Sequence, residues 1–136
     1  MNRLDGDEQK THNFISKDLV GEVKWIEGGK TARVDLRTNA DMKADGRGLV
    51  HGGFTFGLAD YAAMVAVNEP WVVLLSSAVK FLKPVTVGDQ LTAEARLTHT
   101  EGKKRKIWCE VFNQERQKVF AGEFLCYVPE QHVLDL

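Results

Sequence analysis

One stretch, residues 48–68, constrains the fold more than any other part of the chain. It reads GLVHGGFTFGLADYAAMVAVN and contains no proline before Pro70. Leu58, Ala59 and Met64 favour a helix, so the stretch predicts a helix over residues 53–67. Because this helix is apolar on nearly every side, we expect it to be buried all round, with the rest of the chain wrapped about it.

Asp60 breaks the apolar pattern of this predicted helix. An ionised carboxylate is costly to bury without a partner. At about 100° per residue, Gly53, Phe56, Asp60 and Met64 share one side of the helix. The helix N-terminus offers free backbone N–H groups, and glycine there lets a ligand approach closely. The stretch therefore combines amide donors for a developing negative charge with a carboxylate on the same side.

Two ordinary explanations remain open for the same residues. A single aspartate in a helix usually faces solvent, and His51-Gly52-Gly53 can mark no more than a turn. The polar loop 38–48, which contains Asn39, leads directly into His51, and loops in such positions often carry function.

The rest of the chain predicts a mainly antiparallel β structure in one domain. Alternating side chains indicate a hairpin before the helix and a four-strand meander after it, with Gly28-Gly29 at the hairpin turn. The polar N-terminal segment 1–18 is expected to place Phe14 and Ile15 against the core. We expect a single domain over 19–128 and a C-terminal tail over 129–136, with strands at residues 19–27, 30–37, 71–83, 90–100, 103–113 and 118–128.

Composition excludes several classes of function. The chain has 136 residues and a net charge of −1, which gives no reason to expect binding to nucleic acid or a membrane surface. It shows no cleavable signal pattern and no apolar run long enough to span a bilayer, so we expect a cytoplasmic protein.

If the last hairpin turns at residues 115–116, Cys109 faces Gly122, too far from Cys126 for a disulfide. No histidine or cysteine spacing predicts a metal site.

Three motifs in order resemble the hotdog-fold acyl-CoA thioesterases, especially the small thioesterases of the phenylacetate-pathway type. They are His51-Gly52-Gly53, Leu58-Ala59-Asp60, and Phe81-Leu82-Lys83-Pro84 followed by Gly88-Asp89. The resemblance covers residues 20–128. It implies an α+β hotdog fold, in which a curled antiparallel β-sheet wraps around one long central helix.

The resemblance also implies roles for individual residues. Asp60 matches the catalytic carboxylate, Gly53 the residue whose N–H polarises the thioester carbonyl, and His51 a loop-supporting or substrate-contacting position. Members of the family are homodimers or dimers of dimers with the site at the interface, and they use coenzyme A as part of the substrate, without a further cofactor. Our candidates for substrate binding are Asn39, Gly52, Phe54, Phe56, Ser76, Ser77, Lys80, Lys83, Lys104 and Arg105.

A non-catalytic alternative comes from a related class. Regulators that sense malonyl-CoA share the opening seen at residues 51–57, but their helix is usually not acidic at the position of Asp60, and a DNA-binding segment precedes the hotdog. A purely acyl-CoA-binding role is therefore the alternative function. The basic run 103–106 is likewise either a solvated hairpin tip or a contact for the phosphates of coenzyme A.

Overall fold

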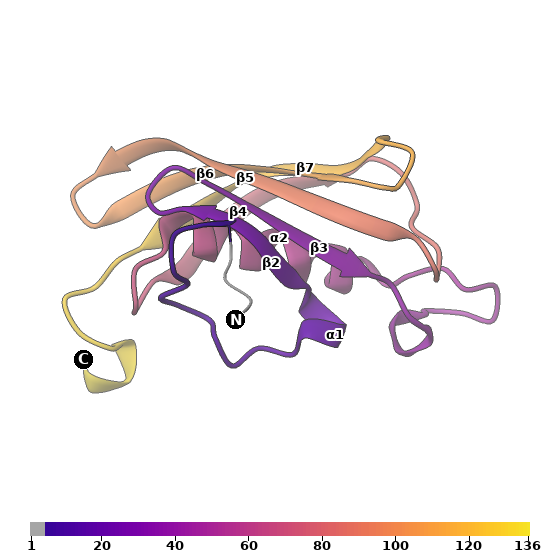
Figure 1. Ribbon diagram of the computed structural model, residues 1–136, viewed down its shortest axis with the longest axis horizontal. Helices are drawn as coiled ribbons and strands as arrows, with labels where there is room; N and C mark the ends of the chain where they lie inside the picture. Colours follow the sequence, from indigo (N-terminus) through magenta and orange to yellow (C-terminus); the bar gives the residue numbers. More distant parts are fainter. Residues whose placement is uncertain (1–4) are drawn as a thin grey trace.

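A curled sheet wraps one long helix in the computed structural model, which describes residues 5–136. The sheet has seven strands in the order β1-β2-β3-β5-β6-β7-β4, and helix α2 lies against its concave face (Figure 1). The predicted α+β hotdog architecture is confirmed. The elements are β1 (Asp5–Gly6), α1 (Lys17–Val20), β2 (Glu22–Glu27), β3 (Thr31–Arg37), η1 (Ala40–Met42), α2 (Gly52–Val67), β4 (Val73–Phe81), β5 (Gln90–Glu101), β6 (Lys104–Phe112), β7 (Lys118–Tyr127) and η2 (Val133–Asp135).

Helix α2 forms where the sequence predicts it, one residue longer at its start. His51 is the N-cap, with an extended backbone and a side chain that accepts from the helix. Asn68 ends the helix in the left-handed conformation at φ 57°, and its N–H donates to the Met64 carbonyl. Ten of the sixteen helical residues are buried, which confirms a helix that is enclosed on almost every side.

The strand order after the helix differs from the predicted four-strand meander. Only β5, β6 and β7 follow one another; β4 pairs with β7 at the edge of the sheet, and β5 pairs with β3. Alternation of side chains fixes which face of a strand is buried but not which strand lies beside it. The β4–β7 pairing depends on Gly122, where a Cβ would lie 2.4 Å from Val79 Cγ1.

The N-terminal part corrects two further expectations. The strand expected from residue 19 begins at Glu22, because Ser16 caps the short helix α1 just before it. Phe14 and Ile15 do not pack into the core; Phe14 is fully exposed and Ile15 is 42% exposed.

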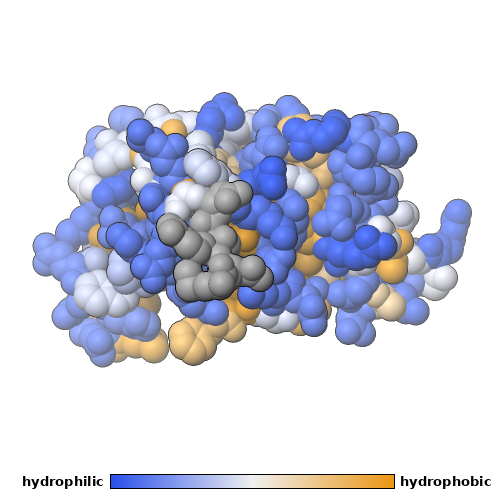
Figure 2. Space-filling model, in the orientation of Figure 1, coloured by the Kyte–Doolittle hydropathy of each residue, from blue (hydrophilic) through white to orange (hydrophobic). Residues whose placement is uncertain are grey.

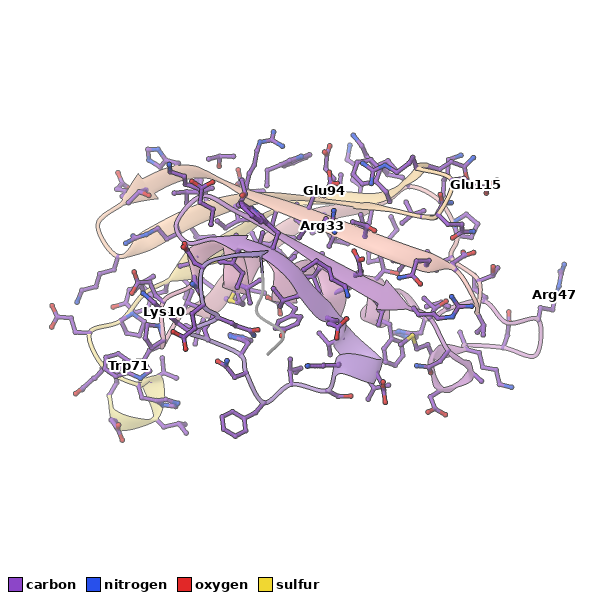
Figure 3. All side chains as sticks on the ribbon, viewed as in Figure 1. Lys10, Arg33, Arg47, Trp71, Glu94 and Glu115 are labelled. Carbon is purple, nitrogen blue, oxygen red and sulfur yellow. The ribbon has the colours of Figure 1, made fainter. Side chains whose placement is uncertain are left out.

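The segment that carries Lys10 lies across the C-terminal end of α2 instead (Figure 3). The buried Asn68 side chain holds it there, accepting from the Lys10 N–H at 2.8 Å and donating to the Glu8 carbonyl at 2.9 Å.

The last hairpin confirms the predicted register. Cys109 lies opposite Gly122, and Cys109 and Cys126 are both free and buried. Burial raises the pKa of both thiols, that of Cys126 to about 12. Both cysteines are therefore unreactive core residues.

The two edges of the sheet are unequal. One edge is the two-residue strand β1, and the other is the nine-residue strand β4. Leu75 and Phe81 on β4 are 50% and 56% exposed. The face seen in Figure 2 is mostly hydrophilic, with hydrophobic residues at its lower margin and in smaller patches between the hydrophilic ones. A long, exposed and apolar edge strand favours pairing with another chain.

Candidate functional site

Helix α2 is open along one stripe, which we define as Gly53, Phe56, Gly57 and Asp60. Gly53 is exposed and the other three are half-buried. This is the side on which the sequence places Gly53, Phe56 and Asp60. Met64, predicted on the same side, is buried. The open stripe therefore runs from the start of the helix to Asp60 and stops there.

The Asp60 carboxylate is under-solvated. Its Oδ1 is buried and has no hydrogen-bond partner within residues 5–136. Burial raises the pKa of Asp60 from 3.8 to about 6. The Asp60 charge also raises the pKa of the buried thiols of Cys126 on β7 and Cys109 on β6, so the carboxylate acts on the part of the core under these two strands. At neutral pH the carboxylate is mostly ionised yet poorly hydrated, which suits a base or a nucleophile.

His51 occupies the helix N-terminus in a defined way. Its Nδ1 accepts a hydrogen bond from the Gly53 N–H at 2.9 Å. A neutral ring in this arrangement carries its proton on Nε2, so His51 offers an N–H donor at the start of the open stripe. Any Cβ at residue 53 would lie 2.9 Å from His51 Nδ1, which explains glycine there. The Gly53 N–H that the family resemblance assigns to the thioester carbonyl is therefore bonded to His51 in this structure.

A pocket of about 310 Å³ opens beside the helix N-terminus. Gly52 borders it and packs against the edge-strand ring of Phe81; a Cβ at Gly52 would lie 3.1 Å from that ring. Lys83 lies at the same pocket, so the structure brings two of the predicted substrate-binding residues together. The complete lining is Leu49, Val50, Gly52, Thr55, Phe81, Leu82, Lys83, Pro84, Val85 and Val119.

Aromatic side chains form one wall of the open stripe. The Phe56 ring lies 5.5 Å from that of Phe124 and 6.4 Å from that of Phe120. Phe81 joins this cluster through Phe120, with ring centroids 5.2 Å apart. Phe56 is thereby fixed against β7, while Phe54 meets the His51 ring edge-on.

The predicted residues of β4 divide between the two faces of the sheet. Ser77 lies opposite Phe124, a core residue, and therefore faces the helix side. Ser76 lies opposite Leu125 and Lys80 opposite Ala121, so both belong to the outer face. Of the two serines, Ser77 is the one that shares a face with Asp60.

Three further predicted residues lie away from Asp60 and the pocket. Lys104 and Arg105 are at the β5–β6 hairpin tip, where Arg105 Nη1 donates to the carbonyls of Gly102 and Lys104. Lys104 pairs with Tyr127 on β7, seven residues and roughly 23 Å along the strand from Phe120. Asn39 caps η1, accepting from the Asp41 N–H at 3.0 Å. Within one chain, these residues and Asp60 do not form one site.

A second hollow, of about 430 Å³, lies on the outer face of the sheet. Arg33 and Glu94 lie side by side there on β3 and β5 (Figure 3). The two acids of this hollow already pair with cations, Glu94 with Arg116 at 3.3 Å and Glu110 with Lys118 at 2.6 Å. The two acids of the outer hollow therefore have cationic partners, whereas the acid of the open stripe has none among residues 5–136.

Gly57 is a member of the open stripe that sequence reasoning did not single out. Its position was available in the sequence, because a glycine in the interior of a helix is unfavourable and needs a reason. A Cβ added at Gly57 would have no atom of residues 5–136 within 4 Å, so the space beside this glycine is open.

Between residues 5 and 136, no helix is long and apolar enough to cross a membrane. In the same part of the chain, no group of three or more histidine, cysteine or acidic side chains is arranged to hold a metal ion.

Comparison with known proteins gives a family and several relatives. The sequence model of the thioesterase superfamily matches residues 47–120. The acyl-coenzyme A thioesterase PaaI of Escherichia coli is 36% identical over 97 residues, which cover 68% of each chain. An uncharacterised protein of Pyrococcus horikoshii, solved by crystallography, is 53% identical, with a TM-score of 0.91 over 95% of this chain and 98% of that one.

Two other relatives are longer proteins. A methylthioribose-1-phosphate isomerase of Aquifex aeolicus is 53% identical over 116 residues, which are 85% of this chain but 25% of the relative. The transcription factor FapR of Caldanaerobacter subterraneus is 26% identical over 126 residues, 93% of this chain and 62% of the relative. The chain thus spans a quarter of one relative and about three fifths of the other, so the names of those whole proteins do not describe this chain.

Proposed function

Because the chain belongs to the thioesterase superfamily, we propose that it hydrolyses an acyl-CoA thioester to a free acid and coenzyme A. The observation that carries this proposal is the Asp60 carboxylate, which is unpaired and half-buried on the open stripe of an otherwise enclosed helix. The similarity to a protein named acyl-coenzyme A thioesterase supports the same substrate class.

The chemistry follows from the two ends of the open stripe. The thioester oxygen gains negative charge when its carbon is attacked, and preorganised N–H donors at the helix start stabilise that charge. With the His51 ring in its present place, His51 Nε2–H and the backbone N–H of Gly52 are the donors; if the ring turns away, the freed Gly53 N–H takes the place of Nε2–H. Such donors, fixed before the reaction, are commonly the largest contribution to catalysis of this type.

Asp60 supplies the second half of the reaction. As a general base it takes a proton from water, whose oxygen bonds to the carbonyl carbon. The carbon–sulfur bond then breaks, and the thiolate of coenzyme A recovers the proton from Asp60. As a nucleophile, the carboxylate would instead bond to the carbonyl carbon and expel the thiolate of coenzyme A, giving an anhydride; water then cleaves the anhydride to the free acid and the Asp60 carboxylate, and the thiolate takes up the proton released. Both routes use the same residues in the same places.

We further propose that the working form is a homodimer paired through β4, with the site at the interface. The exposed apolar residues of this edge support such pairing. A two-fold axis makes two identical edge strands antiparallel, so the Val73 end of the second copy lies beside the Phe81 end of the first. The Val73 end of the sheet carries the basic run 103–106, because Val73 and Lys104 both pair with Tyr127. The run of one copy would thus approach the helix N-terminus of the other, where the phosphates of coenzyme A need cations.

The alternative is an acyl-CoA-binding protein without catalysis. The similarity to FapR along 93% of this chain favours it, and the opening motif at residues 51–57 is the part the sequence resemblance assigns to such regulators. Asp60 argues for the enzyme, since binding alone gives no reason to bury a carboxylate without a partner.

A hydrolysis screen across acyl-CoAs of different length and bulk tests the proposal, with release of free thiol as the readout. We expect at least one acyl-CoA to be cleaved by the wild type and not by Asp60→Asn. Tight binding without hydrolysis of any acyl-CoA would establish the binding function instead. Neither hydrolysis nor binding would refute both functions.

A further inference from the structure

Gly57 combines a position that is costly for a helix with empty space above it. It is the sixth residue of α2, in the helix interior, where glycine is the least favourable residue apart from proline. A Cβ built at Gly57 meets nothing within 4 Å among residues 5–136, whereas a Cβ at Gly52 or Gly53 would press on an aromatic ring. Packing within the chain therefore does not explain this glycine.

The place of Gly57 between the two chemical groups supplies a reason. At about 1.5 Å per residue, Gly57 lies about 6 Å along the helix axis from Gly53 and about 4.5 Å from Asp60. Helical side chains lean towards the N-terminus, so the Asp60 carboxylate covers the turn that contains Gly57. A group that touches the donors at the helix start and the carboxylate together must lie directly on Gly57.

The surroundings leave little other room for that group. Phe56 is fixed against the rings of Phe120 and Phe124 on one flank of the stripe. On the other flank, Tyr61 is buried and held by Gln9 Nε2, which donates to its hydroxyl at 2.9 Å. The space over Gly57 thus lies between two flanks that other contacts hold in place.

We propose that Gly57 is a specificity-determining residue: the acyl end of the thioester lies on its bare backbone, and the absent side chain admits branched or aromatic acyl groups beside Asp60. This inference rests on the proposed function. A glycine there leaves room for one more carbon substituent next to the carbonyl than any other residue would. The substrate class is therefore acyl-CoAs that are bulky near the thioester, in preference to long unbranched ones alone.

The test compares Gly57→Ala and Gly57→Leu with the wild type on acetyl-CoA, isobutyryl-CoA and benzoyl-CoA. We expect Gly57→Ala to lower kcat/KM for the two bulky substrates by roughly tenfold or more relative to acetyl-CoA, the effect of one methyl group in a tight pocket. Gly57→Leu should abolish their hydrolysis. Gly46→Ala is the matched control, because a Cβ at Gly46 also meets nothing within 4 Å, and its activity ratios should stay unchanged.

Thermal unfolding and light scattering of the same variants separate the possible causes. Alanine is the better helix former, so the melting temperature of Gly57→Ala should rise by about 3 °C with the oligomeric state unchanged. A loss of oligomer would show that Gly57 accommodates a second copy of the helix and would overturn the proposal. Equal kcat/KM ratios in wild type and Gly57→Ala would also overturn it, while leaving thioester hydrolysis intact.

Calorimetric binding of thioether analogues of the same three acyl-CoAs keeps the test independent of catalysis. If the wild type binds them without hydrolysing any acyl-CoA, the proposed hydrolysis fails. A selective loss of the bulky analogues in Gly57→Ala would still support the role of Gly57, and equal affinities would refute it. If the wild type binds none of them but hydrolyses a longer acyl-CoA, the specificity proposal fails and the proposed hydrolysis stands.

Discussion

Replacing Asp60 with asparagine should stabilise the fold while it removes hydrolysis. Burial raises the pKa of this carboxyl from 3.8 to about 6, so the folded state binds a proton more tightly than the unfolded chain does. An acid whose pKa is higher in the folded state than in the unfolded chain contributes stability that is fully present below about pH 4. This contribution is lost as the pH rises through about 6. Above that range, the folded state carries an ionised group that it solvates poorly.

The size of the effect follows from the pKa difference of about two units. At about 1.4 kcal/mol per unit the cost of ionised Asp60 is about 3 kcal/mol, and the partial exposure of the side chain lowers it to about 1–2 kcal/mol. Asparagine stays neutral, so Asp60→Asn should gain that amount at about pH 7.5 and nothing at about pH 4. Hydrolysis at about pH 7.5 should fall by roughly 10²-fold or more, the usual effect of losing a general base.

Urea unfolding at several pH values, followed by the fluorescence of the three tryptophans, measures the first part. Protein concentration must be fixed, because the stability of an oligomer depends on it. Asp35→Asn is the matched control: Asp35 also has a buried oxygen without a hydrogen bond, but that oxygen lies 4.0 Å from Arg33 Nε, and no gain is expected. A loss of stability in Asp60→Asn, or a gain that does not depend on pH, would refute this account of Asp60. Undiminished hydrolysis would refute its catalytic role.

Three further predictions concern pH, assembly and the binding of the coenzyme A part of the substrate. The kcat/KM for an acyl-CoA should rise with pH through about 6 and then level off, because ionised Asp60 is the active form; a flat profile from thiol release between about pH 5 and pH 8 would contradict this. Light scattering should give at least twice the chain mass of 15.2 kDa, and Leu75→Glu on the β4 edge should shift the mass towards the monomer; a wild-type monomer would remove the shared-site proposal. Reversing the charges of Lys104 and Arg105 together should raise KM several-fold with little change in kcat. An unchanged KM at low salt would show that the basic run 103–106 is only a solvated hairpin tip.

The sequence predicts those parts of the fold that local rules determine. The apolar run and the capping residues fix α2 to within one residue, and the turn near residue 115 places Cys109 opposite Gly122. The position of β4 beside β7 is different, because it depends on contacts between residues that lie 39 (Phe81 and Phe120) to 54 (Val73 and Tyr127) positions apart in the chain. Alternation of polar and apolar residues is the same for either neighbour, so it does not distinguish them.

The candidate site shows the same division between local and non-local information. Asp60 stands out in the sequence because it violates the pattern of its own helix, and the structure keeps it on the open stripe. The bond between Gly53 N–H and His51 Nδ1 depends on the ring orientation of a capping residue, which spacing alone does not give. The irregular pairing between Leu74 and Ser76 shifts the register of β4, and with it which serine faces the helix.

Beyond its first turn, helix α2 contains a glycine and a charged residue that lower its stability, and both lie on the open stripe. Gly57 weakens the helix by about 1 kcal/mol relative to alanine, and ionised Asp60 adds the cost of a poorly solvated charge. Neither residue gains a compensating contact from residues 5–136: nothing lies within 4 Å of a Cβ at Gly57, and Asp60 Oδ1 has no partner. Elsewhere the helix is filled with alanine and large apolar side chains that suit burial. Folding alone would favour alanine and asparagine at these two positions, so their place on one stripe, one turn apart, is best explained by a ligand that needs bare backbone and a charged oxygen together.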